Sequence, residues 1–320
     1  MDEIVVADEP APAAPRPLWK RILQFPLVAL ILAFLIVTVA QALAAGASFV
    51  AGTPQGQLAS PSDIVFSLAV TVLVVLAYKL VVVRLGEHPR DDLPFDGRAR
   101  DAVSGFAQGT LLFSAIVGVA ALLGVYRALG LSPAEDWLPI LIGTGLMAGV
   151  TEEILLRGIV FRWLEELGGS WLALALSALL FGFLHAANPN ATVVSSLAIA
   201  LAAGVLLGGA YMLTRNLWLA IGLHAGWNVA QGLLWDVPVS GFALDGWVES
   251  RLVGDPMLSG GSFGLEASVI TMVMATIYGV WLIVRAARRG HVVRNWWARR
   301  RLNEAVGVDV DRDPHPLREA

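Results

Sequence analysis

Residues Trp137 to Trp163 read WLPILIGTGLMAGVTEEILLRGIVFRW. This run is apolar over most of its length, yet it holds two adjacent carboxylates, Glu152 and Glu153, and a guanidinium, Arg157, four residues after the second. A charge inside hydrocarbon costs several kcal/mol, so charged side chains within an apolar span usually serve a function. The stretch is long enough to cross a membrane, and its glutamate pair is the first candidate for a functional site.

The composition of the whole chain is that of a membrane protein. Of its 320 residues, 57% are hydrophobic and only 15% are charged, against about 25% charged in an ordinary soluble protein. The chain has no cysteine, which excludes disulfides, thiolate metal ligands and a cysteine nucleophile. No nucleic-acid-binding motif is present, so we expect no nucleic-acid partner.

Apolar segments recur along the chain and predict an all-α, polytopic membrane protein with about eight transmembrane helices. A helix needs about 20 apolar residues to cross a bilayer, and the fifth segment is shorter than this, so seven or nine helices are the alternatives. The predicted spans are residues 26–46, 64–83, 105–126, 137–163, 171–187, 193–213, 217–235 and 267–284.

The charged residues between these segments predict the topology. Arginine is frequent before the first span, between the second and third, and after the last, but Lys and Arg are absent from the first loop. The positive-inside rule therefore places both termini in the cytoplasm. The predicted regions are a disordered cytoplasmic tail (1–22), N-terminal transmembrane helices (23–136), a catalytic core (137–235), an extracytoplasmic loop (236–266), the last transmembrane helix (267–284), and a basic juxtamembrane segment with a tail (285–320), which we expect to contact anionic lipid.

Two histidines and an asparagine join the three charged residues as candidates. His185 ends the fifth apolar segment, and His224 lies in the seventh with Asn228 four residues further on. Residues four apart share one helix face, so His224 and Asn228 project together, as do Glu153 and Arg157. Rough depths along the helices fall near mid-membrane and allow the groups to converge in an active site buried in the helix bundle.

Such a group of side chains is suited to hydrolysis by activated water. A carboxylate accepts a proton from water, imidazoles orient the water or bind a metal, and an asparagine amide donates to a developing oxyanion. Arg157 can neutralise Glu153, which would leave Glu152 free to act as the base. Water, base and oxyanion donor are what amide hydrolysis requires.

Three short motifs on successive apolar segments resemble those of the CAAX-prenyl endopeptidase/Abi family of intramembrane proteases, whose bacterial branch is called CPBP. Each motif alone is weak, but their order and membrane context make the combination specific. The resemblance covers residues 137–235, and no motif position departs from the pattern. The motifs are Glu152-Glu153-x-x-x-Arg157, Phe181-x-x-x-His185 and His224-x-x-x-Asn228.

The resemblance implies an endopeptidase and a role for each candidate. Glu152 would be the general base, with His185 positioning the water; Glu153 and Arg157 would support the geometry. His224 and Asn228 would form the oxyanion site. We treat Phe181 as a packing residue.

Family members are often called metalloproteases, although a metal-free glutamate mechanism is also argued for them. Zn²⁺ held by Glu152, Glu153, His185 and His224 is therefore an alternative. The chain lacks a His-Glu-x-x-His helix, which favours the metal-independent reaction.

Several alternatives to this interpretation remain open. The charged residues can form a buried ionic clamp, and the histidines and asparagine can serve interhelical hydrogen bonding. A non-catalytic scaffold or immunity protein and a proton-coupled transporter are the rival functions, although no internal repeat supports a transporter. The Arg-, Ala- and Gly-rich composition suggests a bacterial plasma membrane, with a membrane-associated peptide or protein, such as a bacteriocin precursor, as the substrate.

Overall fold

The computed structural model describes residues 17–50, 61–86, 90–135, 137–295, 298 and 301. Nearly all regular structure in these residues is helical, which confirms the predicted all-α membrane fold. The α-helices are α1 (Leu18–Gln24), α2 (Pro26–Val50), α3 (Pro61–Leu80), α4 (Arg100–Leu122), α5 (Trp137–Pro139), α6 (Ala148–Glu153), α7 (Arg162–Leu184), α8 (Val193–Ile199), α9 (Val205–Thr214), α10 (Trp218–Val229), α11 (Pro256–Ser259) and α12 (Val269–Arg288).

Wide π-helical segments continue or connect several of these helices. One of them contains Arg157, and two others adjoin the helices that carry Glu152 and His224. The π-helical segments are Ile140–Met147, Ile154–Phe161, Ala200–Gly204 and Ala230–Leu234.

Within the described residues, six helical stretches are long and apolar enough to cross a membrane. One of them, Trp137–Ala187, is 51 residues long and contains both the fourth and the fifth predicted spans. It bends at Gly169, whose φ of 80° is left-handed. The predicted seventh span corresponds to α10 with its π-helical extension, which is shorter than a typical span. The chain is an integral membrane protein, and the number of eight spans stays a prediction.

Large apolar side chains cover the outside of the bundle, as expected for surfaces that face lipid. They line α2, α3, α7 and α12 at helical spacing. Examples are Leu27, Ile31, Leu35, Val65, Val72, Leu76, Leu172, Leu176, Leu179, Val273, Ile277 and Val280.

Several predicted boundaries differ from the observed ones. α4 ends at Leu122, and the expected end of the third span instead begins β1 (Tyr126–Leu131), which pairs antiparallel with β2 (Val248–Leu252). β2 lies in the predicted loop 236–266, so this loop is structured. Ordered helix begins at Leu18, inside the predicted tail. Most of the predicted basic segment after residue 295, and residues 1–16, lie outside the described residues.

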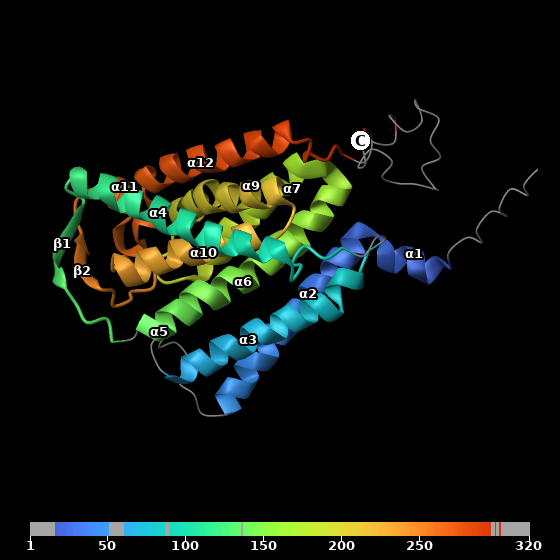
Figure 1. The fold of residues 1–320 in the computed structure, drawn as a ribbon, viewed down its shortest axis with the longest axis horizontal. Coiled ribbons are helices and arrows are strands. Elements are labelled where there is room, and N and C mark those ends of the chain that lie inside the picture. The colour runs from blue at the N-terminus through green and yellow to red at the C-terminus, as the bar shows by residue number, and fades with distance from the viewer. Residues whose placement is uncertain are drawn as a thin grey trace, which may run out of the picture.

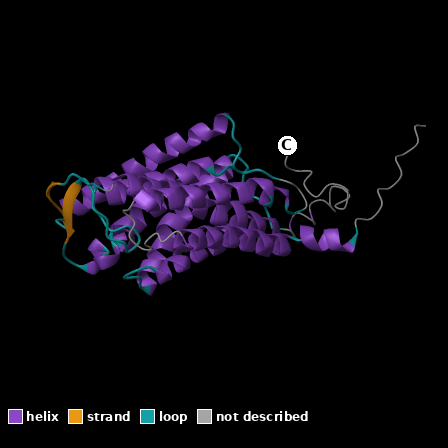
Figure 2. Ribbon diagram, turned by 90° about the horizontal axis from the view of Figure 1, so that it is seen from below, coloured by secondary structure: helices purple, strands orange, loops and turns teal. Residues whose placement is uncertain are grey.

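The helices run along the long axis of the molecule, with the β1–β2 ribbon at one end and α1 at the other (Figure 1; Figure 2). α2 packs on α3 at one side of the bundle, and α12 packs on α9 at the opposite side. α10 lies between α4 and α6, in contact with both. This central helix carries His224 and Asn228.

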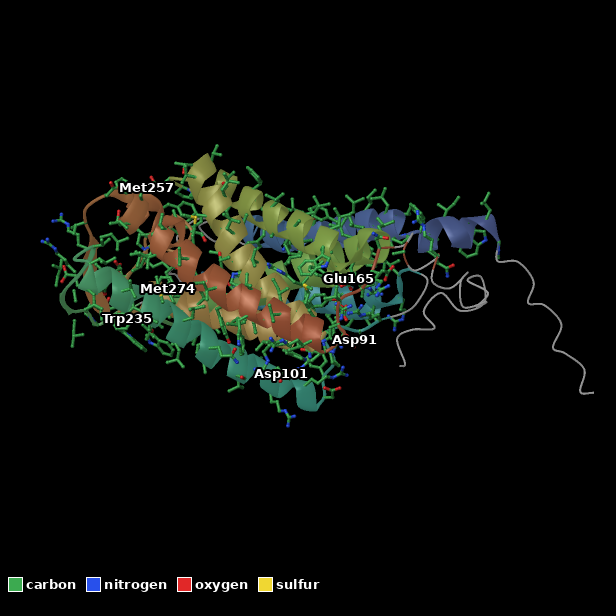
Figure 3. All side chains as sticks on the ribbon, turned by 90° about the horizontal axis from the view of Figure 1, so that it is seen from above. Asp91, Asp101, Glu165, Trp235, Met257 and Met274 are labelled. Carbon is green, nitrogen blue, oxygen red and sulfur yellow. The ribbon has the colours of Figure 1, made fainter. Side chains whose placement is uncertain are left out.

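The labelled side chains mark the two ends of the bundle. The acidic residues Asp91, Asp101 and Glu165 lie toward the end near α1, whereas Trp235 and Met257 lie toward the β-ribbon (Figure 3). At the end near α1, Nη1 and Nη2 of Arg215 donate to the two oxygens of the Glu165 carboxylate over 2.9 and 2.6 Å. Under the predicted topology, this end faces the cytoplasm.

α10 owes its position to glycines that let its backbone touch that of α4. A Cβ atom built on Gly226 would lie 2.1 Å from the carbonyl oxygen of Phe106, and one on Gly222 would lie 2.1 Å from that of Ala102. These neighbours are backbone atoms, so they cannot move aside as the end of a side chain can.

We therefore expect Gly226→Ala to lower the melting temperature of the purified protein in detergent by several degrees, because overpacking costs about 1–3 kcal/mol. Gly118→Ala is the matched control: it also lies in a helix, and a Cβ there meets nothing within 4 Å. Equal melting temperatures for the two variants would show that the close approach of α4 and α10 is not needed.

Candidate active site

Glu153, Arg157 and His224 form a buried hydrogen-bonded unit. Arg157 Nη1 donates to Glu153 Oε1 over 2.8 Å, and His224 Nδ1 lies 2.9 Å from the same oxygen. The Glu153 and Arg157 side chains are completely buried. Because a carboxylate only accepts, His224 Nδ1 carries a proton, and its Nε2 is turned away from Glu153.

The second histidine is oriented by its own helix. His185 follows the last residue of α7, and its Nδ1 donates to the carbonyl oxygen of Phe181 over 2.7 Å. The neutral ring then presents the lone pair of Nε2 on its other side. Phe181 also packs its ring against His185, His224 and the Arg157 guanidinium, with separations of 4.9, 5.8 and 4.7 Å.

Glu152 faces both imidazoles. Its Oε2 lies 4.0 Å from His185 Nε2 and 4.0 Å from His224 Nε2. Its side chain is 34% exposed, whereas that of its neighbour Glu153 is fully buried. Successive helix residues are rotated by about 100°, so the two adjacent carboxylates occupy different surroundings.

Two backbone carbonyls complete the set of polar contacts, and both belong to π-helical segments. Asn228 Nδ2 donates to the carbonyl oxygen of Thr144 over 2.9 Å, and Arg157 Nη2 donates to that of Gly204 over 3.2 Å. An amide nitrogen has two hydrogens, so Asn228 keeps a second N–H for another acceptor. Carbonyls of two π-helical segments therefore hold polar side chains that belong to other parts of the chain.

A cavity of about 370 Å³ adjoins these residues. Most of its lining is apolar, as in typical ligand sites. Glu153 and Arg157 lie behind its wall rather than on it. The candidates on the lining are Glu152, His185, His224 and Asn228, with Phe181 and Thr144 beside them.

Part of the predicted loop closes the cavity. The turn Val239–Phe242, here called the cap turn, contributes Val239, Ser240 and Phe242 to the lining. Its end residues exchange two backbone hydrogen bonds of 2.9 Å, and Ser240 and Gly241 both have positive φ. Asn188 Nδ2 donates to the carbonyl oxygen of Ser240 over 3.1 Å. The cap turn is thereby fastened to the segment that carries His185.

The residues predicted as an alternative zinc site do not fit a zinc shell in this geometry. Zinc ligands lie about 2.0–2.2 Å from the metal, which places tetrahedral donors about 3.4 Å apart; the Glu152–histidine separations are 4.0 Å. Glu153 contacts Arg157 and His224 Nδ1 rather than the cavity. Among the described residues, no three His, Cys, Asp or Glu side chains are grouped to hold a metal ion.

The structure thus brings together all six residues proposed from the sequence, from the fourth, fifth and seventh predicted spans. It divides them into four that line the cavity and two, Glu153 and Arg157, that support His224 from behind. The sequence interpretation did not identify Trp227, Ser240 or Glu266 as cavity residues. Glu266 had a detectable signal, because it is an acidic residue directly before the last apolar segment.

One comparison with known proteins found a match to the central part of the chain. The family model described as "Rce1-like: Type II CAAX prenyl endopeptidase Rce1-like" matches residues 134–230. This range includes every candidate residue named from the sequence. No curated protein and no solved structure matches the chain.

Proposed function

We propose that this membrane protein hydrolyses a peptide bond with water activated by Glu152, because residues 134–230 match the model of the Rce1-like type II CAAX prenyl endopeptidases. The match to this family model and the apolar helices both support a CAAX-protease-like intramembrane endopeptidase. The observation that most supports the mechanism is the position of Glu152 Oε2, 4.0 Å from both histidine Nε2 atoms.

Polar atoms 4.0 Å apart are too distant for a direct hydrogen bond but suitably placed to share a water. A water there donates one hydrogen to Glu152 and the other to the lone pair of His185 Nε2. Its oxygen keeps a lone pair that attacks the carbonyl carbon of the substrate. Glu152 takes the proton as the new C–O bond forms, and then delivers it to the leaving amine as the C–N bond breaks.

Residues of α10 provide the hydrogen-bond donors for the oxygen of the reacting carbonyl. Glu153 holds Nδ1–H of His224, and in this proposal Nε2 is protonated as well and donates to the oxyanion. The second N–H of Asn228 is the other donor. Glu153 Oε1 contacts both Arg157 and His224, so it stabilises a positive His224, which in turn stabilises the negative charge that develops on the substrate.

The substrate we propose is a membrane-associated peptide or protein, such as a bacteriocin precursor, in a bacterial plasma membrane with both chain termini in the cytoplasm. The apolar cavity within the bundle supports a substrate that arrives through the bilayer. We also propose that the basic C-terminal segment binds anionic lipid at the membrane surface.

The test is cleavage by purified wild-type protein in liposomes that contain a peptide with a membrane anchor and a short polar flank. In H₂¹⁸O, we expect ¹⁸O in the newly formed carboxyl group. Metal content of the same preparation, and activity before and after chelation, test the water-only mechanism. Ion or solute flux that depends on Glu152, without cleavage of any peptide, would instead establish the transporter alternative.

A further inference from the structure

A second carboxylate, Glu266, lies on the cavity wall outside the matched family region. It is 8% exposed and belongs to a short helical turn, Leu265–Ala267, before α12. Its Oε2 accepts from Ser240 N–H over 2.7 Å and from Ser240 Oγ over 2.9 Å. Its Oε1 accepts from Trp227 Nε1 over 3.3 Å. N–H and O–H donors on both oxygens suit an ionised carboxylate.

Glu266 is linked to the helix that carries the proposed oxyanion donors through Trp227, whose Nε1–H is shared between Glu266 and Gln231 Oε1, which is 2.9 Å away. Its partner Trp227 directly precedes Asn228 and follows His224 by three residues on α10. Both Trp227 and Glu266 line the same cavity as Glu152. A peptide bound with its scissile carbonyl at His224 and Asn228 would therefore place a neighbouring residue beside Glu266.

The cavity lining holds more carboxylates than proposed cations: His224 is the histidine that the mechanism makes positive, and it faces Glu152. Its lining contains two carboxylates, Glu152 and Glu266, but no Lys or Arg among the described residues. No Lys, Arg or His of the described chain forms an ion pair with Glu266. The donors that hold Glu266 are neutral, so its negative charge is available to a charged group of the substrate.

From these contacts we infer that Glu266 is a specificity residue that favours a cationic side chain next to the scissile bond and disfavours a free α-carboxylate there. This inference rests on the proposed hydrolysis and deepens it by naming the substrate class. Unlike charges attract strongly where water is excluded, and like charges repel. Because a CAAX box ends in the C-terminal carboxylate of its protein, such a substrate would bring a third negative charge into the cavity.

The experiment compares three membrane-anchored peptides that differ only on the C-terminal side of the cleaved bond. One carries a lysine near that bond, one is neutral and ends in an amide, and one ends there in a free carboxylate. With wild-type protein we expect kcat/KM to fall in that order, and Glu266→Gln should reduce the lysine-to-carboxylate ratio by about tenfold, which corresponds to about 1.4 kcal/mol.

Ser240→Ala is the matched control, because it removes one hydrogen bond to Glu266 and loosens the cap turn while the carboxylate keeps its charge. It should retain the ratio of the wild type even if its overall rate falls. Failure to cleave any peptide would contradict the proposed function itself. If all three peptides were cleaved and the lysine-to-carboxylate ratio of kcat/KM were the same in the wild type and in Glu266→Gln, only the role of Glu266 would be contradicted.

Discussion

Replacing Glu152 with glutamine is expected to lower kcat by about a thousandfold, within the range for loss of a general acid–base group. Glutamine has nearly the same shape as glutamate but cannot take a proton from water or return one to the leaving amine. The melting temperature should stay close to that of the wild type, because Glu152 is partly exposed and its nearest ionisable partners are 4.0 Å away. Turnover of an anchored peptide in liposomes and thermal unfolding in detergent measure the two properties.

Glu152→Asp provides the control for this experiment. It keeps the base but withdraws the carboxylate by one methylene, so we expect an intermediate rate. A glutamine variant that retained a tenth or more of the wild-type kcat would show that another group activates the water.

Replacing Arg157 with methionine is expected to destabilise the protein by about 3–5 kcal/mol, the usual effect of leaving one partner of a buried ion pair without the other. The Glu153 carboxylate would then be buried with His224 as its remaining partner. Few other hydrogen bonds stabilise the two buried charges, since Glu153 Oε2 and Arg157 Nε have no hydrogen-bond partner among the described residues. Chemical or thermal unfolding in detergent gives the change in stability.

The double variant Glu153→Gln with Arg157→Met separates charge balance from packing. It contains no unpaired charge and should recover much of the stability lost in Arg157→Met. Its activity should remain low, because a glutamine at position 153 no longer stabilises a positive His224. If Arg157→Met alone were as stable as the wild type, Glu153 and Arg157 would not form an ion pair in the folded protein.

Sequence spacing predicted the parts of this site that depend on one helix. The interval of four residues placed Arg157 against Glu153, and the observed separation of 2.8 Å agrees with it. The apolar segments likewise predicted the main helices, because their lengths match the thickness of a bilayer. The same spacing placed His224 and Asn228 on one face of their helix. Their hydrogen-bond partners, Glu153 and Thr144, belong to other helical segments, and the spacing did not identify them.

Contacts between helices could not be derived from periodicity. Glu153 and His224 are 71 residues apart, and Asn228 and Thr144 are 84 apart. The packing that joins them depends on backbone contacts of α10, such as that of Gly226 with Phe106. The position of the cap turn on the cavity lining could not be predicted either. Residues 236–266 have no helical periodicity that would indicate which part of the bundle they contact.

The carbonyls of Thr144 and Gly204 show how a membrane protein can offer backbone hydrogen-bond acceptors to buried side chains from within its helices. Soluble enzymes commonly carry their reactive groups on loops, but a lipid-exposed loop within a bilayer would leave its peptide groups without partners. A widened helical turn offers a carbonyl to a side chain while the chain stays helical. The backbone can thereby bind a buried side chain while its own peptide groups stay hydrogen-bonded and away from the lipid.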